Sequence, residues 1–248
     1  MKKIVFILLV CLILPAPSIA AVGFDAASEC DADCDAPSTS DTWAHAVGST
    51  GTILLVGGNV GGQTLTGTYA GAALTAIFDT PSGSTSTCVR CSLFYKVSPA
   101  TGSNDIVMSR PGSDNAVFTA ISLNGSLTDA SVLGIAASTS CSGCTATSKA
   151  FTTLHNDSMV TDNFTFNSGN QAGIAATGPD QTLRISDVPF ADVNSHASTQ
   201  PVPVAGSSTI AYSWTSSSNV FLAITEVKTA EGAAPAAASV IRRIYILD

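Results

Sequence analysis

The sequence has little charge. Only 11% of its 248 residues are charged, and 18 acidic residues against 10 basic ones give a formal net charge of −8. No basic stripe is present that could neutralise phosphate groups, which argues against nucleic-acid binding. Hydrophobic residues make up 45% of the chain. That is enough to build a core, so the chain is expected to fold although it has few charges.

The sequence also lacks helical periodicity. Short runs of Val, Ile, Leu, Thr, Phe and Tyr alternate with clusters of Gly, Ser, Asn, Asp and Pro. This pattern predicts an all-β protein, a single antiparallel β-sandwich that resembles a jelly roll. The expected strands are residues 42–47, 52–57, 65–69, 74–79, 92–97, 105–109, 116–123, 149–154, 158–166, 182–185, 208–214 and 220–228.

Groups that could carry catalysis are scarce. The chain has three histidines, His45, His155 and His196, and three glutamates, and it has no Gly-x-Ser-x-Gly elbow. Ser-rich sequences always allow a Ser-His-Asp set on paper, so such a set carries no weight without geometry. We therefore nominate no catalytic residue and expect a protein that is not an enzyme.

The first twenty residues have the order of a secretory signal. Lys2 and Lys3 precede the apolar run 4–14, and Pro15 and Pro17 then lead to the small-residue site 18–20. The apolar run is too short to cross about 30 Å of hydrocarbon, so a cleavable signal peptide over 1–20 is favoured over an anchor. Nothing after it is apolar enough to span a bilayer. We expect a secreted protein that is extracellular or located at the cell surface.

Outside this signal, six cysteines form three close pairs. They are Cys30 and Cys34, Cys88 and Cys91, and Cys141 and Cys144. In an exported protein such pairs are expected to be local disulfides that staple turns. A zinc site built from two Cys-x-x-Cys pairs and a redox motif are the alternatives, but no histidine is near and no βαβ pattern is present.

The loop around the first cysteine pair is acidic. Asp31, Asp33 and Asp35 are close enough to suggest a calcium site, because hard cations prefer several carboxylates. The pattern departs from a calcium-binding loop, with Ala36 where a glycine is expected and Thr42 where a glutamate is expected. The alternative is a solvated loop held by a disulfide. No other cofactor is expected.

Two features could involve sugars. Asn124, Asn156 and Asn163 begin Asn-x-Ser/Thr sequons, which accept glycans in a suitable host but also arise by chance in a chain rich in Ser and Thr. Flat aromatic side chains could also bind a glycan by stacking, although their position inside expected strands favours a place in the core. These aromatic residues are Trp43, Tyr69, Tyr95, Tyr212 and Trp214.

The chain divides into five parts. A signal peptide (1–20) precedes an acidic N-terminal segment (21–41), the β-sandwich (42–228), a Pro/Ala/Gly-rich linker (229–239) and a C-terminal strand (240–248). The last strand could pair with its own sheet, add to the sheet of a neighbouring copy and so propagate a filament, or serve as a sorting tail. Its strand-forming residues are Val240, Ile241, Ile244, Tyr245, Ile246 and Leu247.

Residues 52–57, 68–75 and 93–102 read Thr-Ile-Leu-Leu-Val-Gly, Thr-Tyr-Ala-Gly-Ala-Ala-Leu-Thr and Leu-Phe-Tyr-Lys-Val-Ser-Pro-Ala-Thr-Gly. They resemble segments of a jelly-roll-like β-sandwich module that recurs in bacterial secreted and surface proteins. Residues 158–162, 206–214 and 223–228 are similar to its closing strands. The resemblance covers about 42–228, and it departs at Ala70-Gly71, where the module favours Gly-Gly, and at the added cysteines. It implies an extracellular location and no catalytic residues, since the module is mostly uncharacterised.

These observations favour a non-enzymatic extracellular structural protein. We expect a self-assembling subunit of a surface fibre, appendage or layer, joined through terminal strands. The alternative is an extracellular adhesin or carbohydrate-binding module.

Overall fold

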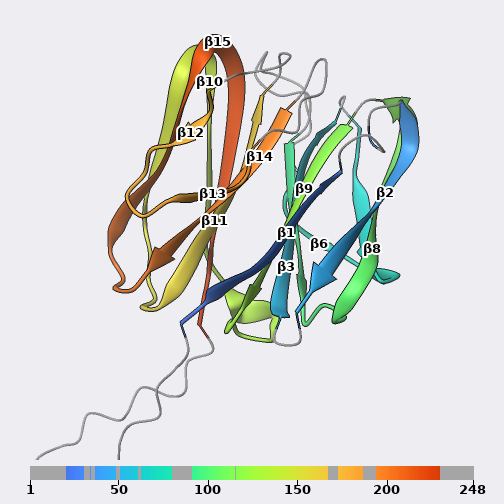
Figure 1. The fold of residues 1–248 in the computed structure, drawn as a ribbon, viewed down its shortest axis with the longest axis horizontal. Coiled ribbons are helices and arrows are strands. Elements are labelled where there is room, and N and C mark those ends of the chain that lie inside the picture. The colour runs from blue at the N-terminus through green and yellow to red at the C-terminus, as the bar shows by residue number, and fades with distance from the viewer. Residues whose placement is uncertain are drawn as a thin grey trace, which may run out of the picture.

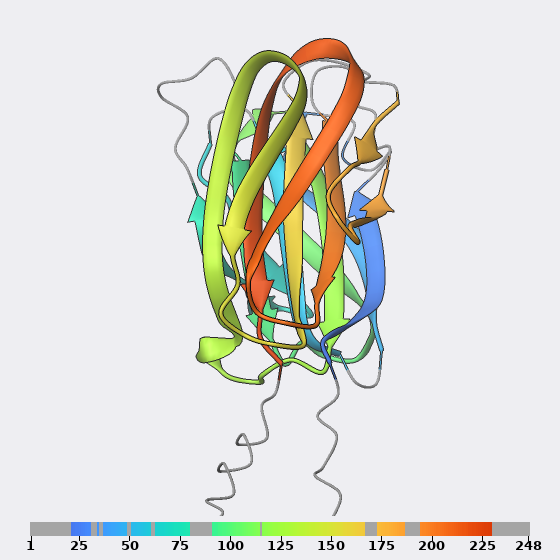
Figure 2. The same ribbon diagram turned by 90° about the vertical axis from the view of Figure 1, so that its left-hand side faces the viewer.

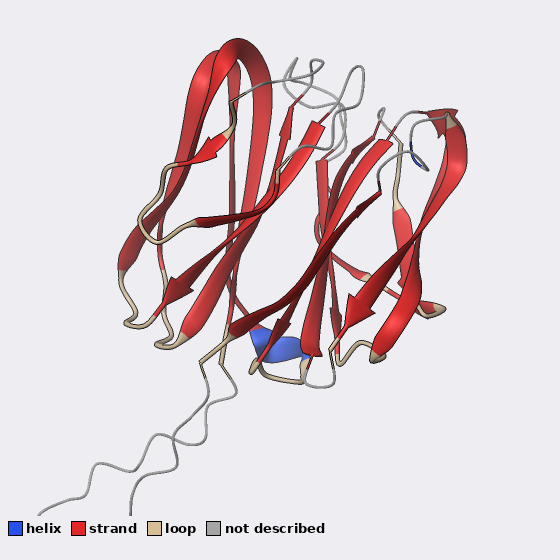
Figure 3. Cartoon of the chain, in the orientation of Figure 1, coloured by secondary structure: helices blue, strands red, loops and turns tan. Residues whose placement is uncertain are grey.

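The computed structural model describes residues 21–30, 34, 37–48, 51–60, 63–79, 91–114, 116–166, 173–186 and 194–229. The expected signal peptide, nearly all of the linker and the C-terminal strand 240–248 lie outside these residues. The described residues are mainly strands, with the short 3-10 helix η2 (Ala130–Val132) and no α-helix (Figure 3). All pairings between the strands are antiparallel, so the predicted all-β antiparallel class is confirmed.

The N-terminal half of the chain contributes two sheets. The larger has the order β1-β9-β3-β7-β6, and the smaller has the order β2-β8-β4-β5. The strands of the larger sheet are β1 (Gly23–Cys30), β9 (Ala116–Asn124), β3 (Gly51–Val60), β7 (Cys91–Val97) and β6 (Thr75–Asp79). The strands of the smaller sheet are β2 (Ser38–Val47), β8 (Gly102–Asp114), β4 (Thr66–Tyr69) and β5 (Ala72–Ala73).

The C-terminal half forms one sheet that folds over itself. Its order is β10-β15-β11-β14-β13, and β12 pairs with β15 off this path. Two long strands bend near the middle of their length, where the register between them shifts, so that their far ends arch back over the sheet (Figure 2). The strands are β10 (Leu133–Thr152), β11 (Ser158–Phe166), β12 (Ala175–Ala176), β13 (Thr182–Ile185), β14 (Asn194–Val202) and β15 (Ser207–Val227).

The two halves share one topology. Both main sheets arrange their strands in the same way. The strand that comes first in the chain lies at one edge, followed in space by the last, the second, the fourth and the third. This order is β1-β9-β3-β7-β6 in the N-terminal half and β10-β15-β11-β14-β13 in the C-terminal half. In the smaller sheet, β2, β8 and β4 correspond to the last part of β10 (146–152), the first part of β15 (207–213) and β12. The described part of the chain therefore repeats one strand plan twice.

The sheets stack in layers with three hydrophobic cores between them (Figure 1). Strand β3 lies in the middle of the stack and is buried on both faces. Its Ile53 and Leu55 pack against the C-terminal half, whereas Leu54 and Val56 pack against the β2-β8 sheet. The third core, around Phe164, lies within the folded-over sheet. The fold thus has more layers than the single pair of sheets expected from the sequence.

The acidic segment 21–41 is part of the fold. It was expected to precede the sandwich, but β1 runs through it and pairs with β9 over its whole length, and β2 begins within it. Val22 is buried and its N–H donates to the Asp157 carbonyl at 2.9 Å. Segment 21–41 therefore contributes an edge strand of a central sheet rather than a separate acidic loop.

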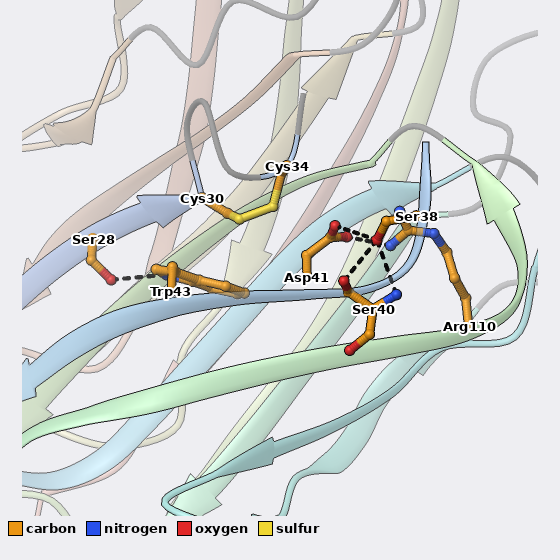
Figure 4. The surroundings of a disulfide bond; sticks show 8 residues. All are labelled: Ser28, Cys30, Cys34, Ser38, Ser40, Asp41, Trp43 and Arg110. Atoms are coloured by element: carbon orange, nitrogen blue, oxygen red, sulfur yellow. Dashed lines mark hydrogen bonds and ion pairs between the residues drawn. A yellow bond between two sulfur atoms is a disulfide. The ribbon is translucent and has the colours of Figure 1, made fainter. Parts of the chain in front are cut away.

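A disulfide lies at the corresponding corner of each half. Cys30 and Cys34 are joined where the chain leaves β1 for β2, and Cys141 and Cys144 are joined at the bend of β10. Figure 4 shows the first corner, where the disulfide is close to Trp43. Two of the three predicted disulfides are therefore present. One lies where the chain passes from the sheet of β1 to the sheet of β2, and the other lies where β10 bends away from the main sheet. Cys88 of the third pair lies outside the described residues.

Candidate functional site

A cluster of polar side chains lies inside the folded-over C-terminal sheet. The carboxylate of Asp162, on β11, accepts a hydrogen bond from the Ser198 hydroxyl of β14 and another from the Tyr212 hydroxyl of β15, the latter at 2.7 Å. Ser198 is fully buried, and Asp162 and Tyr212 are nearly so. Three strands thus bring one carboxylate and two hydroxyls together out of contact with water.

Gln181 completes this cluster from the residue that precedes β13. Its amide Nε2 donates to the Ser198 Oγ at 2.9 Å. Its Oε1 accepts two backbone N–H groups, from Gly178 at 3.0 Å and from Ala211 at 3.1 Å. The carboxamide is therefore held at both ends, with its oxygen facing two donors and its nitrogen facing a hydroxyl.

Burial controls the ionisation of this cluster. It raises the pKa of Asp162 from 3.8 to about 7, and the hydrogen bonds from Ser198 and Tyr212 offset only part of that rise. The pKa of Tyr212 is raised well above 10 by burial and by the neighbouring Asp162 charge. Asp162 thus exchanges its proton near neutral pH, as a general base requires.

The fold does not need polar residues at this place. In the N-terminal half, β3 and β7 occupy the positions of β11 and β14. The residues paired across these two strands, Val56 and Phe94, are buried and apolar. Val56 pairs with Ala120 of β9, as Asp162 pairs with Ile224 of β15. The same strand plan therefore packs well with hydrocarbon where the C-terminal half has a carboxylate, which costs free energy to bury.

A second buried carboxylate in the C-terminal half has a structural role. Glu226 of β15 is fully buried and accepts hydrogen bonds from the backbone N–H groups of Leu154 and His155 and from the Ser158 hydroxyl. A Cβ on Gly134 would come within 2.2 Å of this carboxylate, so the glycine leaves room for it. Glu226 thereby fixes the loop between β10 and β11.

The N-terminal half has a comparable anchor. Asp25 of β1 accepts the Gly48 N–H at 2.9 Å and the Ser122 hydroxyl at 2.8 Å, which fixes the loop after β2. Nearby, His45 Nδ1 lies 2.8 Å from the Ser28 Oγ, and burial lowers the pKa of His45 to about 4 although Asp25 opposes that shift. Ser28, His45 and Asp25 do not form a triad, because among the described residues no hydrogen bond joins Asp25 to His45.

One ion pair is fully buried in the N-terminal half. Arg110 of β8 pairs with Asp41 of β2, and both side chains are inaccessible to solvent. Ser38 donates a hydrogen bond to the same carboxylate at 2.9 Å, as Figure 4 shows beside the first disulfide. This pair joins the ends of the two strands and leaves no charge facing outward.

The residues of the calcium prediction cannot be placed. Asp31, Asp33 and Asp35 lie outside the described residues. Within the described residues, no group of three or more His, Cys, Asp or Glu side chains could hold a metal ion. No helix in that part of the chain is long and apolar enough to cross a membrane.

The three sequons differ in exposure. Asn156 is exposed and Asn124 is half-buried. Asn163 is buried, and its Nδ2 donates to the Thr119 Oγ1 at 3.0 Å and to the Ser195 Oγ at 2.8 Å between the two halves. The prediction of a glycan on Asn163 is therefore corrected, because a sugar there would separate the sheets.

The aromatic side chains considered for sugar stacking are mostly in the cores. Trp43, Tyr69, Tyr212 and Trp214 are buried, and Tyr95 is partly buried against the central core. Exposed flat rings are needed for stacking on a pyranose. These five side chains therefore offer no aromatic platform.

Sequence reasoning missed the buried polar cluster. Its one available signal is Asp162 between Val160 and Phe164, because alternate residues of a strand share a face and a lone carboxylate then falls among core residues. The side-chain pairs that are hydrogen-bonded in this cluster are 17 to 50 residues apart in the chain, so no local motif contains them. His196, one of the three histidines, lies buried in β14 beside Phe166.

Comparisons with protein-family models, with curated proteins and with solved structures find no match.

Proposed function

We propose that this chain is a secreted, non-enzymatic structural subunit that assembles with copies of itself by strand addition. The observation that carries the proposal is the free edge of β10. This strand pairs only with β15 among the described residues, so its other edge has no strand partner there. Such an edge is a template for another strand.

The inner part of β10 lacks the usual protection against pairing. Edge strands are normally guarded by charged residues or proline. Residues 133–141 read Leu-Gly-Ile-Ala-Ala-Ser-Thr-Ser-Cys and contain neither. The other edge strands of four or more residues each carry a charge: β1, β2, β6 and β13. The unguarded part of β10 is thus exceptional among the described edge strands of four or more residues.

The C-terminal strand supplies a matching donor. Its residues Val240, Ile241, Ile244, Tyr245, Ile246 and Leu247 have strong β-propensity. The chain from Thr229 to Val240 can span about 35 Å when extended, which leaves the donor strand a long tether. Strand addition from one copy to the next is a head-to-tail contact, which propagates instead of closing.

The remaining chemistry is consistent with a structural role. The carboxylates of Asp25, Asp41 and Glu226 accept hydrogen bonds from backbone or side-chain donors that fix loops and strands. The expected signal peptide and the resemblance to a module of bacterial surface proteins support an extracellular location. Disulfides at both corners suit that environment.

Two variants test this proposal. Deletion of 240–248 removes the donor, and Ser140→Lys places a charge at an exposed position of the acceptor edge. Both are expected to abolish assembly measured by light scattering while the melting temperature of the subunit is retained. Ser216→Lys, at an exposed position in the bend of β15, is the matched control and is expected to assemble normally.

A synthetic peptide of residues 240–248 provides a direct competition. It is expected to cap the β10 edge and shorten the assemblies of the full chain. Assembly that is unaffected by the deletion, by Ser140→Lys and by the peptide would overturn the proposal.

A further inference from the structure

We propose that Ser198 and Gln181 form an intramolecular ester bond within the folded chain, with Asp162 as the base, and that this bond covalently staples β13 to β14. The proposal goes beyond the assembly function and uses none of the residues of the β10 edge. It rests on the relative positions of a hydroxyl, a carboxamide, a carboxylate and two backbone donors.

Ser198 has the surroundings of an activated nucleophile. Its hydroxyl donates its hydrogen bond to the Asp162 carboxylate, which can take the proton as the oxygen attacks. Tyr212 holds the other carboxylate oxygen at 2.7 Å and so fixes the orientation of the base. Ser198 is fully buried, so water does not compete with it as a nucleophile.

The Gln181 carboxamide has the surroundings of an activated electrophile. Its Oε1 faces the N–H groups of Gly178 and Ala211 at 3.0 and 3.1 Å, the distances at which backbone donors stabilise a developing oxyanion. A Cβ on Gly178 would come within 2.6 Å of that oxygen and within 2.4 Å of the Thr209 carbonyl oxygen. Glycine is therefore needed for the donor to approach this closely.

The reacting groups are already in contact. The Ser198 Oγ lies 2.9 Å from the Gln181 Nε2, and Cδ is the next atom along the side chain. Attack requires the Ser198 Oγ to move toward the face of Cδ while Oε1 keeps its two N–H donors. Holding reactants in such contact removes most of the entropic barrier to a bimolecular step.

The reaction balances without a co-reactant. The Ser198 Oγ forms a bond to the Gln181 Cδ while its proton passes to Asp162, and the negative charge develops on Oε1 between the two N–H groups. The C–N bond then breaks, Asp162 returns the proton to the departing nitrogen, and ammonia leaves. The products are the ester, one ammonia molecule and the regenerated Asp162 carboxylate.

The proton affinity of Asp162 suits both steps. Its pKa of about 7, raised by burial, makes it a stronger base than an exposed carboxylate and still lets it release the proton to the leaving group. The facing groups in hydrogen-bond contact are Ser198 and Tyr212, and Tyr212 stays neutral because its own pKa is raised.

A second Gln–Ser pair in the same half serves as an internal control. Gln200 Nε2 donates to the Ser208 Oγ at 2.8 Å, which repeats the contact between Gln181 and Ser198. Among the described residues, no carboxylate is hydrogen-bonded to Ser208. This pair therefore lacks a base and is expected to remain unlinked.

Mass spectrometry of the purified full chain tests the ester. The intact mass is expected to be one ammonia below that of the disulfide-bonded sequence. Trypsin cuts after Lys149, Arg184 and Lys228, so Gln181 and Ser198 fall in separate, cysteine-free peptides, 150–184 and 185–228. These two peptides are expected to appear joined after reduction, and hydroxylamine, which cleaves esters, is expected to separate them.

Three variants assign the roles. Ser198→Ala and Asp162→Asn are expected to give the full mass and two separate peptides, whereas Ser208→Ala keeps the linked product. The wild-type peptides decide the matter even where a variant fails to fold. Separate wild-type peptides with unmodified masses would overturn the proposal, and so would a link that resists hydroxylamine. Neither result bears on assembly through β10.

Discussion

Gly57 of β3 lies directly against Asn163 of β11, at the interface between the two halves of the chain. A Cβ on Gly57 would come within 2.3 Å of the Asn163 Cγ. Asn163 in turn donates hydrogen bonds to Thr119 of the N-terminal half and to Ser195 of the C-terminal half. The missing side chain at one position thus makes room for a polar clamp that joins the two halves.

Gly57→Ala is expected to destabilise the chain, because the added methyl group forces Asn163 out of its hydrogen bonds. The expected loss in the free energy of unfolding is about 1–3 kcal/mol, measured by urea denaturation. Gly206→Ala is the control, since a Cβ there meets nothing within 4 Å. Equal stability of the two variants would contradict the close packing of Gly57 against Asn163.

Glu226→Ala is expected to lower the free energy of unfolding by about 3 kcal/mol, because the N–H groups of Leu154 and His155 lose their buried acceptor. Hydrogen exchange should become faster at these amides in particular. Asp105→Ala removes an exposed carboxylate of β8 and is the matched control, with little expected change. Unchanged exchange at Leu154 and His155 would contradict the role of Glu226 as an anchor of this loop.

Asp162 should make the chain less stable as the pH rises. Because the folded pKa of about 7 exceeds the unfolded value of 3.8, the native state binds more protons between these values. Its contribution therefore falls from about pH 4 to pH 7, by about 4 kcal/mol at most.

Buried histidines act in the opposite direction over part of this range. The pKa values of His45 and His196 are both lowered to about 4 by burial, so their contribution to stability rises as the pH increases from 4 to 6.5. The wild type must therefore be compared with Asp162→Asn by denaturation at several pH values. The difference should grow in favour of the variant as the pH rises, and a difference that does not depend on pH would contradict the account.

The corner disulfides are expected to contribute modestly. The Cys141–Cys144 bond closes a very short loop, so replacing both cysteines with alanine should cost about 2 kcal/mol or less. The double variant at Cys30 and Cys34 should behave similarly, because that loop is almost as short. Thermal unfolding followed by circular dichroism measures both, and complete unfolding of either variant at room temperature would contradict this expectation.

The sequence predicted strands best where their residues favour strands intrinsically. The bounds of β11 and β13 agree with the predicted 158–166 and 182–185, because β-branched and aromatic residues are concentrated there. In the last part of β15, which overlaps the predicted strand 220–228, Phe221 and Ala223 face the central core while Leu222 and Ile224 face the folded-over core, so both faces are buried.

Other strands depend on their partners. The first half of β10 consists mainly of Ala, Ser, Thr and Gly and has little intrinsic preference for a strand, but it follows β15 in register from Ala136 to Cys141. β1 and β14 were missed for the same reason. The buried cluster could not be predicted either, since Asp162, Ser198, Tyr212 and Gln181 meet only after four separate segments have paired.

Electron microscopy of the full chain tests the central proposal most directly. Strand addition at β10 predicts filaments of uniform width that lengthen with protein concentration, and their absence after deletion of 240–248. Monodisperse single particles at every concentration, with and without residues 240–248, would contradict it.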